Sequence, residues 1–469
     1  MEFARSGGLI YTDAIDNSAG VDCSDHEVNI KILTNAIVAN DDMTLKQRDS
    51  LLESMTEDVG LHVLRDNYLQ TQCVDLCAVD GALAFNEQSR FMQHLEAIGR
   101  LDRAIEYLPD SEEIADRMAN DLALVKPEIA VLVSYSKMVM FDELMGSNFT
   151  TDPALEATLM DYFPTALKTG HEEQIKTHRL RPEIIATIVT NGVINRLGPT
   201  FVFRMQQELN ASSEDVATAF VIVEDIFNLR NLWSSIEELD NQINSNEQYL
   251  MQILVRGLVE RATHWLIRNR KTENTISDLI SRFKPGLAEL IQAMPDCLSP
   301  AEQQTLDQRV KHFTDAGAPE QTAIAVARVV PLSSSLDIVE IAASINQPVA
   351  NVAAVYFALG QHLELSWLRE RIGTLVASSH WHKLATAELR GDLHYQQRHL
   401  CAEVANVTDD ALSPEERVQQ WSNRNASATS QYQALIGDLK ATHSVDFAML
   451  SLAINEVHKL LRSDRPLAS

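Results

Sequence analysis

From Lys31 to the end of the chain the sequence pattern is helical almost throughout. This pattern limits the fold of the chain more than any other feature. Ser299-Pro300-Ala301-Glu302 and Ser413-Pro414-Glu415-Glu416 both match a capping box with proline at the first helical position. Apolar residues recur at helical spacing between such starts. One apolar face is formed by Ile129, Leu132, Val133 and Met140. Because strand-like alternation is scarce beyond the first fifteen residues, the sequence predicts a mainly α fold.

The first thirty residues form the exception, because a short extended run leads there into a polar turn. The run spans Leu9 to Ile15, and an amphipathic segment begins near Ser24. Ser18, Ala19 and Gly20 are small enough to let a ligand approach the backbone. The free N–H groups at the start of a helix favour an anion. We therefore predict a small α/β segment with a ligand-binding turn, and these arguments alone do not name the ligand.

Three domains are predicted along the chain. Two prolines flank a polar turn between Met294 and Pro300, which is the best candidate boundary. The predicted domains are the α/β segment (residues 1–40), a helical domain (residues 41–295) and a second helical bundle (residues 296–469). Lys126-Pro127-Glu128 and Arg181-Pro182-Glu183 resemble each other, either as two ordinary helix starts or as a duplicated helical hairpin.

The charge of the chain excludes several classes of partner. With 39 Lys and Arg against 66 Asp and Glu, the net charge is −27. Nucleic acids and anionic membrane surfaces both require positive charge, so we expect neither as a partner. No apolar run is long enough for a transmembrane helix, and no signal-peptide pattern occurs at the start. Five cysteines in a chain of this length do not form a disulfide framework, which favours a cytoplasmic location.

The polar turn resembles a known substrate-binding turn. Asn17, Gly20, Val21, Ser24 and Glu27 match in register the pattern Asn-Ala-Gly-Gly-Val, two residues, Ser, two residues, Glu. This pattern is typical of glutamate dehydrogenases. The sequence of residues 13–27 closely resembles that of one subfamily, the large bacterial NAD-specific glutamate dehydrogenases. The resemblance continues through residues 180–196 and 263–269, and its order indicates the C-terminal region of such an enzyme.

The resemblance implies roles for three residues. The hydroxyl of Ser24 would contact a carboxylate of glutamate, although serine is also a common helix N-cap. Asn17 would lie against the nicotinamide end of NAD, although asparagine is also common in turns that bind no ligand. Gly20 belongs to the same predicted cofactor-binding turn.

The remainder of such an active site is expected outside this chain. Among the 17 glycines, none form the Gly-x-Gly-x-x-Gly turn that binds a dinucleotide pyrophosphate. NAD would therefore be bound mainly by residues before Met1, and the catalytic Lys and Asp would also lie there. We predict no catalytic residue in this chain, and no activity for it alone. The whole protein is expected to be a homo-oligomer that converts L-glutamate to 2-oxoglutarate and ammonia, a reaction of amino-acid catabolism. The alternative is a helical assembly or regulatory domain without chemistry of its own.

Two groups of residues resemble metal ligands, and the sequence predicts a metal site for neither. Asp22, Asp25, His26 and Glu27 lie within six positions, where such residues rarely converge on one ion. Acidic residues in a first helical turn are favourable by themselves. The Cys73–Cys77 pair has no second pair to complete a zinc site, so both thiols are expected in the core.

Overall fold

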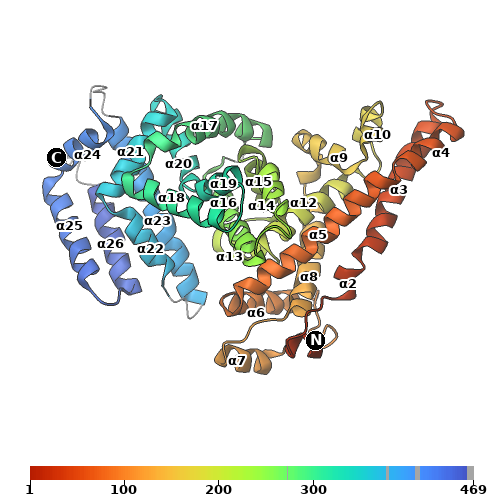
Figure 1. Ribbon diagram of the computed structural model, residues 1–469, viewed down its shortest axis with the longest axis horizontal. Coiled ribbons are helices and arrows are strands. Elements are labelled where there is room, and N and C mark those ends of the chain that lie inside the picture. Colours follow the sequence, from red (N-terminus) through yellow and green to blue (C-terminus); the bar gives the residue numbers. More distant parts are fainter. Residues whose placement is uncertain (272, 376–379, 407–411, 462–469) are drawn as a thin grey trace. The chain divides into compact units, whose positions relative to one another are not determined.

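The computed structural model describes residues 1–271, 273–375, 380–406 and 412–461. Within these ranges every regular element is a helix and no strand occurs, so the prediction of a mainly α fold is confirmed (Figure 1). The chain divides into two compact units. The first contains residues 1–224 and 259–277, and the second contains residues 225–258 and 278–469. The predicted division into residues 1–40, 41–295 and 296–469 stays a prediction.

The first unit contains most of the helices of the N-terminal half. They are α1 (Glu2–Arg5), α2 (Asp13–Asp16), α3 (Ser18–Ala39), α4 (Leu45–Ser54), α5 (Thr56–Asp80), α6 (Ala82–Ala97), α7 (Ser111–Ala119), α8 (Lys126–Met145), α9 (Glu156–Tyr162), α10 (Thr165–Lys168), α11 (Glu172–Lys176), α12 (Arg181–Leu197) and α13 (Phe201–Leu209), with the 3-10 helices η1 (Phe149–Thr151) and η2 (Pro153–Leu155). The chain passes from one unit to the other within α14 (Ser213–Ile226), α16 (Ser245–Asn269) and α17 (Ile276–Cys297).

The second unit contains the remaining helices. They are α15 (Leu229–Glu237), α18 (Pro300–Asp315), α19 (Glu320–Leu332), α20 (Ser335–Ile345), α21 (Val349–His362), α22 (Leu365–Gly373), α23 (His380–Ala405), α24 (Pro414–Arg424), α25 (Ala426–Ala441) and α26 (Phe447–Leu460).

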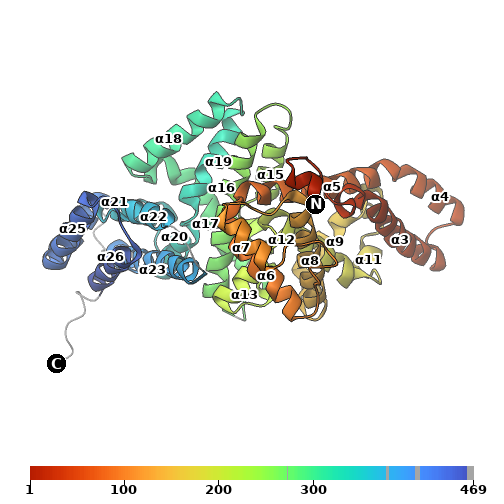
Figure 2. The same ribbon diagram turned by 90° about the horizontal axis from the view of Figure 1, so that it is seen from below.

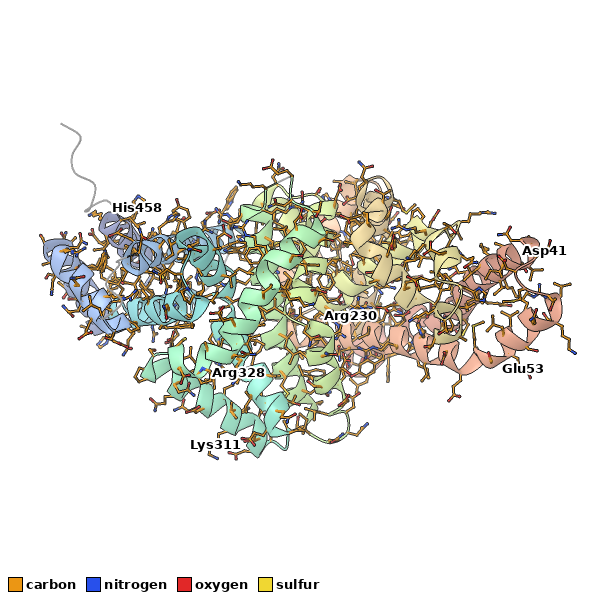
Figure 3. All side chains as sticks on the ribbon, turned by 90° about the horizontal axis from the view of Figure 1, so that it is seen from above. Asp41, Glu53, Arg230, Lys311, Arg328 and His458 are labelled. Atoms are coloured by element: carbon orange, nitrogen blue, oxygen red, sulfur yellow. The ribbon has the colours of Figure 1, made fainter. Side chains whose placement is uncertain are left out.

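In the first unit, α5, α8 and α12 pack against one another and form the centre. The buried side chains include Val74 on α5, Leu132 on α8 and Ile185 on α12. α3 lies along α5, and the short α4 joins the two helices (Figure 1). Figure 3 labels Asp41, just after α3, and Glu53 in α4, at the tip of this helical hairpin. The arrangement places the start of α3 beside the middle of α5.

In the second unit, α21 and α23 pack together, and α20, α22, α24 and α26 contact this pair. α25 packs against α26, as Figure 2 also shows. The buried phenol of Tyr432 donates a 2.6 Å hydrogen bond to the carbonyl oxygen of Leu363, which joins α25 to the α21–α22 connection. Among the described helices, no single one combines the length and apolar character of a membrane span, and only α19 and α20 pass that test as a pair bent by 61°.

Local sequence signals place several helix starts correctly. The Ser299 hydroxyl accepts the Glu302 N–H at 3.3 Å, and the Glu302 carboxylate accepts the Ser299 N–H at 3.2 Å. Ser413 and Glu416 repeat this reciprocal arrangement at α24. The predicted starts at Lys126 and Arg181 begin α8 and α12. The interpretation of these segments as helix starts is therefore confirmed, while the duplicated hairpin stays a prediction.

The first residues differ from the expected strand and turn. Gly8 to Thr12 form no regular element, and Asp13–Asp16 are helical in α2, so Leu9 to Ile15 is not a strand here. A strand needs a neighbour for its backbone hydrogen bonds, and the described residues offer none. The following helix begins at Ser18, earlier than the start expected near Ser24. At the other predicted boundary, α17 continues through Pro295 to Cys297.

Candidate functional site

The residues predicted to bind substrate and cofactor lie together on one face of α3. Asn17 directly precedes the helix, and Gly20 and Ser24 follow at intervals of three and four positions, which places neighbours on one helical face. All three residues are exposed. Val21 and Val28 lie beside them on the helix and are 67% and 48% exposed. This face is therefore open to a ligand or to another part of a larger protein.

Asn17 and Gly20 are directly packed against each other. The N–H of Gly20 donates to the carbonyl oxygen of Asn17 at 3.2 Å. A Cβ atom at position 20 would lie 3.1 Å from the side-chain oxygen of Asn17. Glycine at this position therefore leaves room for the Asn17 amide beside the first turn of α3.

Ser24 lies in the second turn of α3 and is exposed. It cannot be the N-cap, because that position is occupied by Asn17, whose side chain makes no capping hydrogen bond. The N-cap interpretation of Ser24 is wrong because the helix starts six residues earlier than the sequence pattern indicated. Its contact with a substrate carboxylate stays a prediction.

Two sets of hydrogen bonds fix the segment before α3. The side-chain amide of Asn67 on α5 donates to the carbonyl oxygen of Ile15 at 2.8 Å and to the hydroxyl of Ser18 at 3.0 Å. The phenol of Tyr11 donates to the Asp75 carboxylate at 2.6 Å, and Lys126 Nζ lies 2.7 Å from the same carboxylate. The turn is thus held by α5 and α8.

The opposite face of α3 contributes to a cluster of titratable groups that the sequence did not predict. Asp22 and His26 of α3 meet Asp66 of α5, and one ligand atom from each lies within 4.8 Å of the other two. His26 Nε2 is 3.9 Å from Asp22 Oδ1. His62, one turn before Asp66, has its ring centroid 5.5 Å from that of His26. The sequence signal was a second Asp/His pair at four-residue spacing, and only the packing of α3 on α5 joins the two pairs.

An aromatic wall closes one side of this cluster. The His26 ring stacks on the Tyr162 ring at 4.3 Å with an interplanar angle of 14°. The side-chain amide of Asn29 donates to the Tyr162 hydroxyl at 2.8 Å. His178 Nδ1 accepts the Leu180 N–H at 3.0 Å, so its Nε2 carries a proton and donates to the Asn29 carbonyl oxygen at 3.0 Å. Tyr162 and His26 are therefore held in fixed positions.

Burial changes the protonation of the cluster. It raises the pKa of Asp22 to about 7, with help from the nearby charges of Asp66 and Asp25. It also raises the pKa of Asp66. Burial and the adjacent His62 lower the pKa of His26 to about 4. Burial lowers the pKa of Lys137, on α8, to about 8. A cluster with these properties can hold a proton or a cation.

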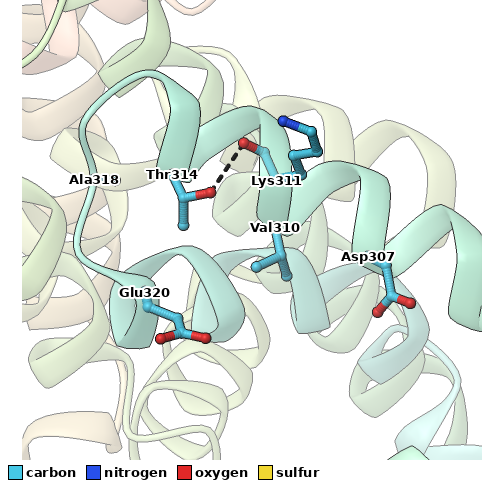
Figure 4. A pocket seen from close by; sticks show the side chains of 6 residues that line it. All are labelled: Asp307, Val310, Lys311, Thr314, Ala318 and Glu320. Atoms are coloured by element: carbon cyan, nitrogen blue, oxygen red, sulfur yellow. Dashed lines mark hydrogen bonds between the residues drawn. The ribbon is translucent and has the colours of Figure 1, made fainter.

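A separate hollow lies between α18 and α19 in the second unit (Figure 4). It is lined by Asp307, Val310, Lys311, Thr314, Ala318 and Glu320. The Thr314 hydroxyl is occupied by a 3.0 Å hydrogen bond to the Lys311 carbonyl oxygen. Figure 4 draws no other hydrogen bond among these lining residues, and we assign the hollow no ligand.

Comparison with known proteins identifies the class to which this fold and turn belong. Residues 121–459 match the family described as glutamate dehydrogenase, C-terminal, and residues 1–77 match the bacterial NAD-glutamate dehydrogenase catalytic domain. The first match covers well over half of the chain, so the chain belongs to the glutamate dehydrogenase C-terminal family. The resemblance of the chain to the C-terminal region of NAD-specific glutamate dehydrogenases is thereby confirmed.

Individual relatives agree with this assignment. The chain is 37% identical over 465 residues to the NAD-specific glutamate dehydrogenase of Pseudomonas aeruginosa. It is 34% identical over 464 residues to that of Halomonas elongata, and 31% identical over 463 residues to that of Mycobacterium tuberculosis. Each match covers 99% of this chain but only 28–29% of the relative, so the chain spans less than a third of the length of these enzymes.

Proposed function

We propose that this chain is part of an NAD-specific glutamate dehydrogenase, and that the exposed face of α3 forms one wall of its active site. The main observation in support of this proposal is that Asn17, Gly20 and Ser24 share one exposed face of a helix whose other face is buried. In the whole enzyme, Ser24 Oγ donates a hydrogen bond to a carboxylate of L-glutamate, and the Asn17 amide lies against the nicotinamide end of NAD. Gly20 allows this close approach.

The chemistry itself belongs to other residues of the whole enzyme. In the whole enzyme, NAD would accept a hydride from the α-carbon of glutamate, and hydrolysis of the resulting imine would release ammonia and 2-oxoglutarate. The dinucleotide-binding glycine turn and the catalytic Lys and Asp are supplied from outside this chain. The chain alone is expected to be inactive for this reason.

Apolar side chains support a contact between α3 and the rest of the enzyme. Leu9 and Ile10 are 83% and 44% exposed, and both precede the turn that leads into α3. Val21 and Val28 lie on the exposed side of α3 itself. Apolar groups concentrated near a predicted ligand site are typical of an interface. In the whole enzyme, the Leu9 to Thr12 segment joins the sheet of the dinucleotide domain as the expected α/β segment.

A variant at Val21 tests this proposal. In the full-length enzyme, Val21→Glu places a charge in the proposed interface and should abolish most glutamate-dependent NAD reduction while the helical content stays unchanged. Val79→Glu is the control, because Val79 is an exposed valine (50%, against 67% for Val21) that lies at the far end of α5. Full activity in Val21→Glu would contradict the proposed active-site wall.

A second role is proposed for the helices after α3. Their packing offers stable surfaces on which catalytic domains can assemble, and the first and second units are each independently compact. We therefore propose that these helices support a cytoplasmic homo-oligomer and its regulation. Light scattering on the full-length enzyme and on a variant ending before Ser299 tests this role. An unchanged subunit number together with unchanged kinetics would argue against it.

A further inference from the structure

We propose that Asp22, His26 and Asp66 bind one divalent transition-metal ion, for which Zn²⁺ is the best candidate, between α3 and α5. The three side chains come from two helices that pack along each other (Figures 1 and 2). The site is distinct from the exposed face that carries Ser24, because it lies on the opposite side of α3.

The spacing of the residues suits a site between two helices. Asp22 and His26 are four residues apart on α3, and His62 and Asp66 are four residues apart on α5, so each pair lies on one helical face. The three ligand atoms lie within 4.8 Å of one another. Ligand atoms around one zinc ion stand roughly 3–4 Å apart, since each bond is about 2.0–2.2 Å long. Small side-chain rotations therefore suffice to close the set around an ion.

Unsatisfied buried atoms point independently to a missing ligand. His26 is only 1% exposed, its Nε2 faces Asp22 Oδ1 at 3.9 Å, and its Nδ1 has no hydrogen-bond partner. Asp22 Oδ2 is also buried without a partner. Among the described residues, no lysine or arginine nitrogen lies within 4.0 Å of the Asp22 or Asp66 carboxylate. Buried charged groups are normally paired or coordinate metals, and an ion here would satisfy both carboxylates.

The donor set selects the kind of ion. An imidazole nitrogen favours zinc and other transition metals, whereas Mg²⁺ and Ca²⁺ prefer shells made entirely of oxygen. Two carboxylates neutralise the charge of a divalent ion, and the His62 ring lies next to the His26 ring, with 5.5 Å between their centroids. Lys137 also faces the two carboxylates, while its Nζ donates to Gln70 Oε1 at 3.2 Å. The ion and this ammonium group would therefore compete for the cluster.

The ion would fasten α3 to α5 immediately behind the face that carries Asn17 and Ser24. Such a structural site contributes its binding free energy to the stability of the folded chain. Its expected consequence is a higher melting temperature of the chain in the presence of Zn²⁺, with no change in the presence of Mg²⁺.

Calorimetric titration of the chelator-treated chain with ZnCl₂ tests the proposal. All proteins in the test carry Cys23→Ala, because the exposed Cys23 thiol could bind zinc by itself. We expect one Zn²⁺ per chain and no binding of Mg²⁺. Asp66→Asn should weaken zinc binding at least tenfold, because a lost ligand costs no less than a lost supporting contact. Asp49→Asn is the control, because Asp49 is an exposed carboxylate on α4, away from the cluster.

A spectroscopic measurement keeps the test independent of folding defects in the variants. X-ray absorption of the zinc-loaded Cys23→Ala chain should show a shell of nitrogen and oxygen with an imidazole contribution and no sulfur. Absence of stoichiometric binding, a sulfur shell, or equal affinity in Asp66→Asn and Asp49→Asn would each overturn the proposal.

Discussion

The side-chain amide of Asn67 donates to the hydroxyl of Ser18 at 3.0 Å, across 49 residues of sequence. The same amide donates to the Ile15 carbonyl oxygen at 2.8 Å, so one residue of α5 satisfies two groups at the start of α3. This contact fixes the position at which α3 begins. It thereby sets the direction in which Asn17, Gly20 and Ser24 project.

Asn67→Ala should destabilise the first unit by about 1–3 kcal/mol, because it leaves part-buried acceptors without their donor. Urea unfolding followed by circular dichroism measures this loss. Asn120→Ala is the control, since the Asn120 amide bonds only within its own helical turn and is exposed. Equal stabilities of the two variants would show that Asn67 does not hold the turn.

Ser24→Ala in the full-length enzyme should raise KM for glutamate roughly tenfold, because a charge-assisted hydrogen bond is worth about 1.5–3 kcal/mol. KM for NAD should change little. Steady-state kinetics measures both constants, with the exposed Ser54→Ala variant on α4 as the control. If KM for glutamate stays at the wild-type value, Ser24 is an ordinary surface serine.

Glu128→Ala should destabilise the chain by about 3–5 kcal/mol. Glu128 is fully buried and accepts two hydrogen bonds from the Arg117 guanidinium, at 2.8 and 2.9 Å, so its removal leaves that buried cation with Glu113 alone as its charged partner. Burial alone would raise the pKa of Glu128, but the bonds from Arg117, the Val125 N–H and Arg5 hold it below its usual range.

The free energy of unfolding in urea measures the effect of Glu128→Ala. Glu27→Ala is the control, because Glu27 forms an exposed pair with Lys31 that contributes only about 0–1 kcal/mol. A loss at Glu128 no larger than the loss at Glu27 would mean that the buried pair adds nothing to stability.

Local sequence signals predict much of this fold, and spatial relationships account for what they miss. The capping boxes at Ser299 and Ser413 need only four consecutive residues, so the sequence alone predicts them. The expected strand at Leu9 to Ile15 depends on a neighbouring strand that the described residues do not contain. Asp66 joins Asp22 and His26 only through the packing of α5 on α3, and no pattern within either segment reveals that contact.

The pH dependence of stability should contain a contribution from His264. Burial, reinforced by Arg268 and Arg261, lowers the pKa of His264 to about 4 from 6.5. The unfolded chain therefore binds more protons between pH 6.5 and 4, and the stability due to neutral His264 is lost as the pH falls through this range.

Removal of this imidazole should make stability less dependent on pH. His264→Gln should show a shallower decline of the melting temperature between about pH 6.5 and pH 4 than the wild type. Differential scanning calorimetry across this range measures it, with His443→Gln at an exposed position as the control. Parallel declines in the wild type and His264→Gln would exclude His264 as a source of acid sensitivity.

Gly286 on α17 packs against Val339 on α20 within the second unit. A Cβ atom at position 286 would lie 2.8 Å from Val339 Cγ1, so Gly286→Ala should destabilise this unit by about 1–3 kcal/mol through overpacking. Gly257→Ala on α16 is the matched control, because nothing lies within 4 Å of a Cβ atom there. That change should stabilise the chain by up to about 1 kcal/mol through helix propensity. Val339→Ala combined with Gly286→Ala should recover part of the loss. Denaturant unfolding of the wild type, Gly286→Ala, Val339→Ala and the double variant measures the coupling. Strictly additive effects would mean that these two side chains do not meet in solution.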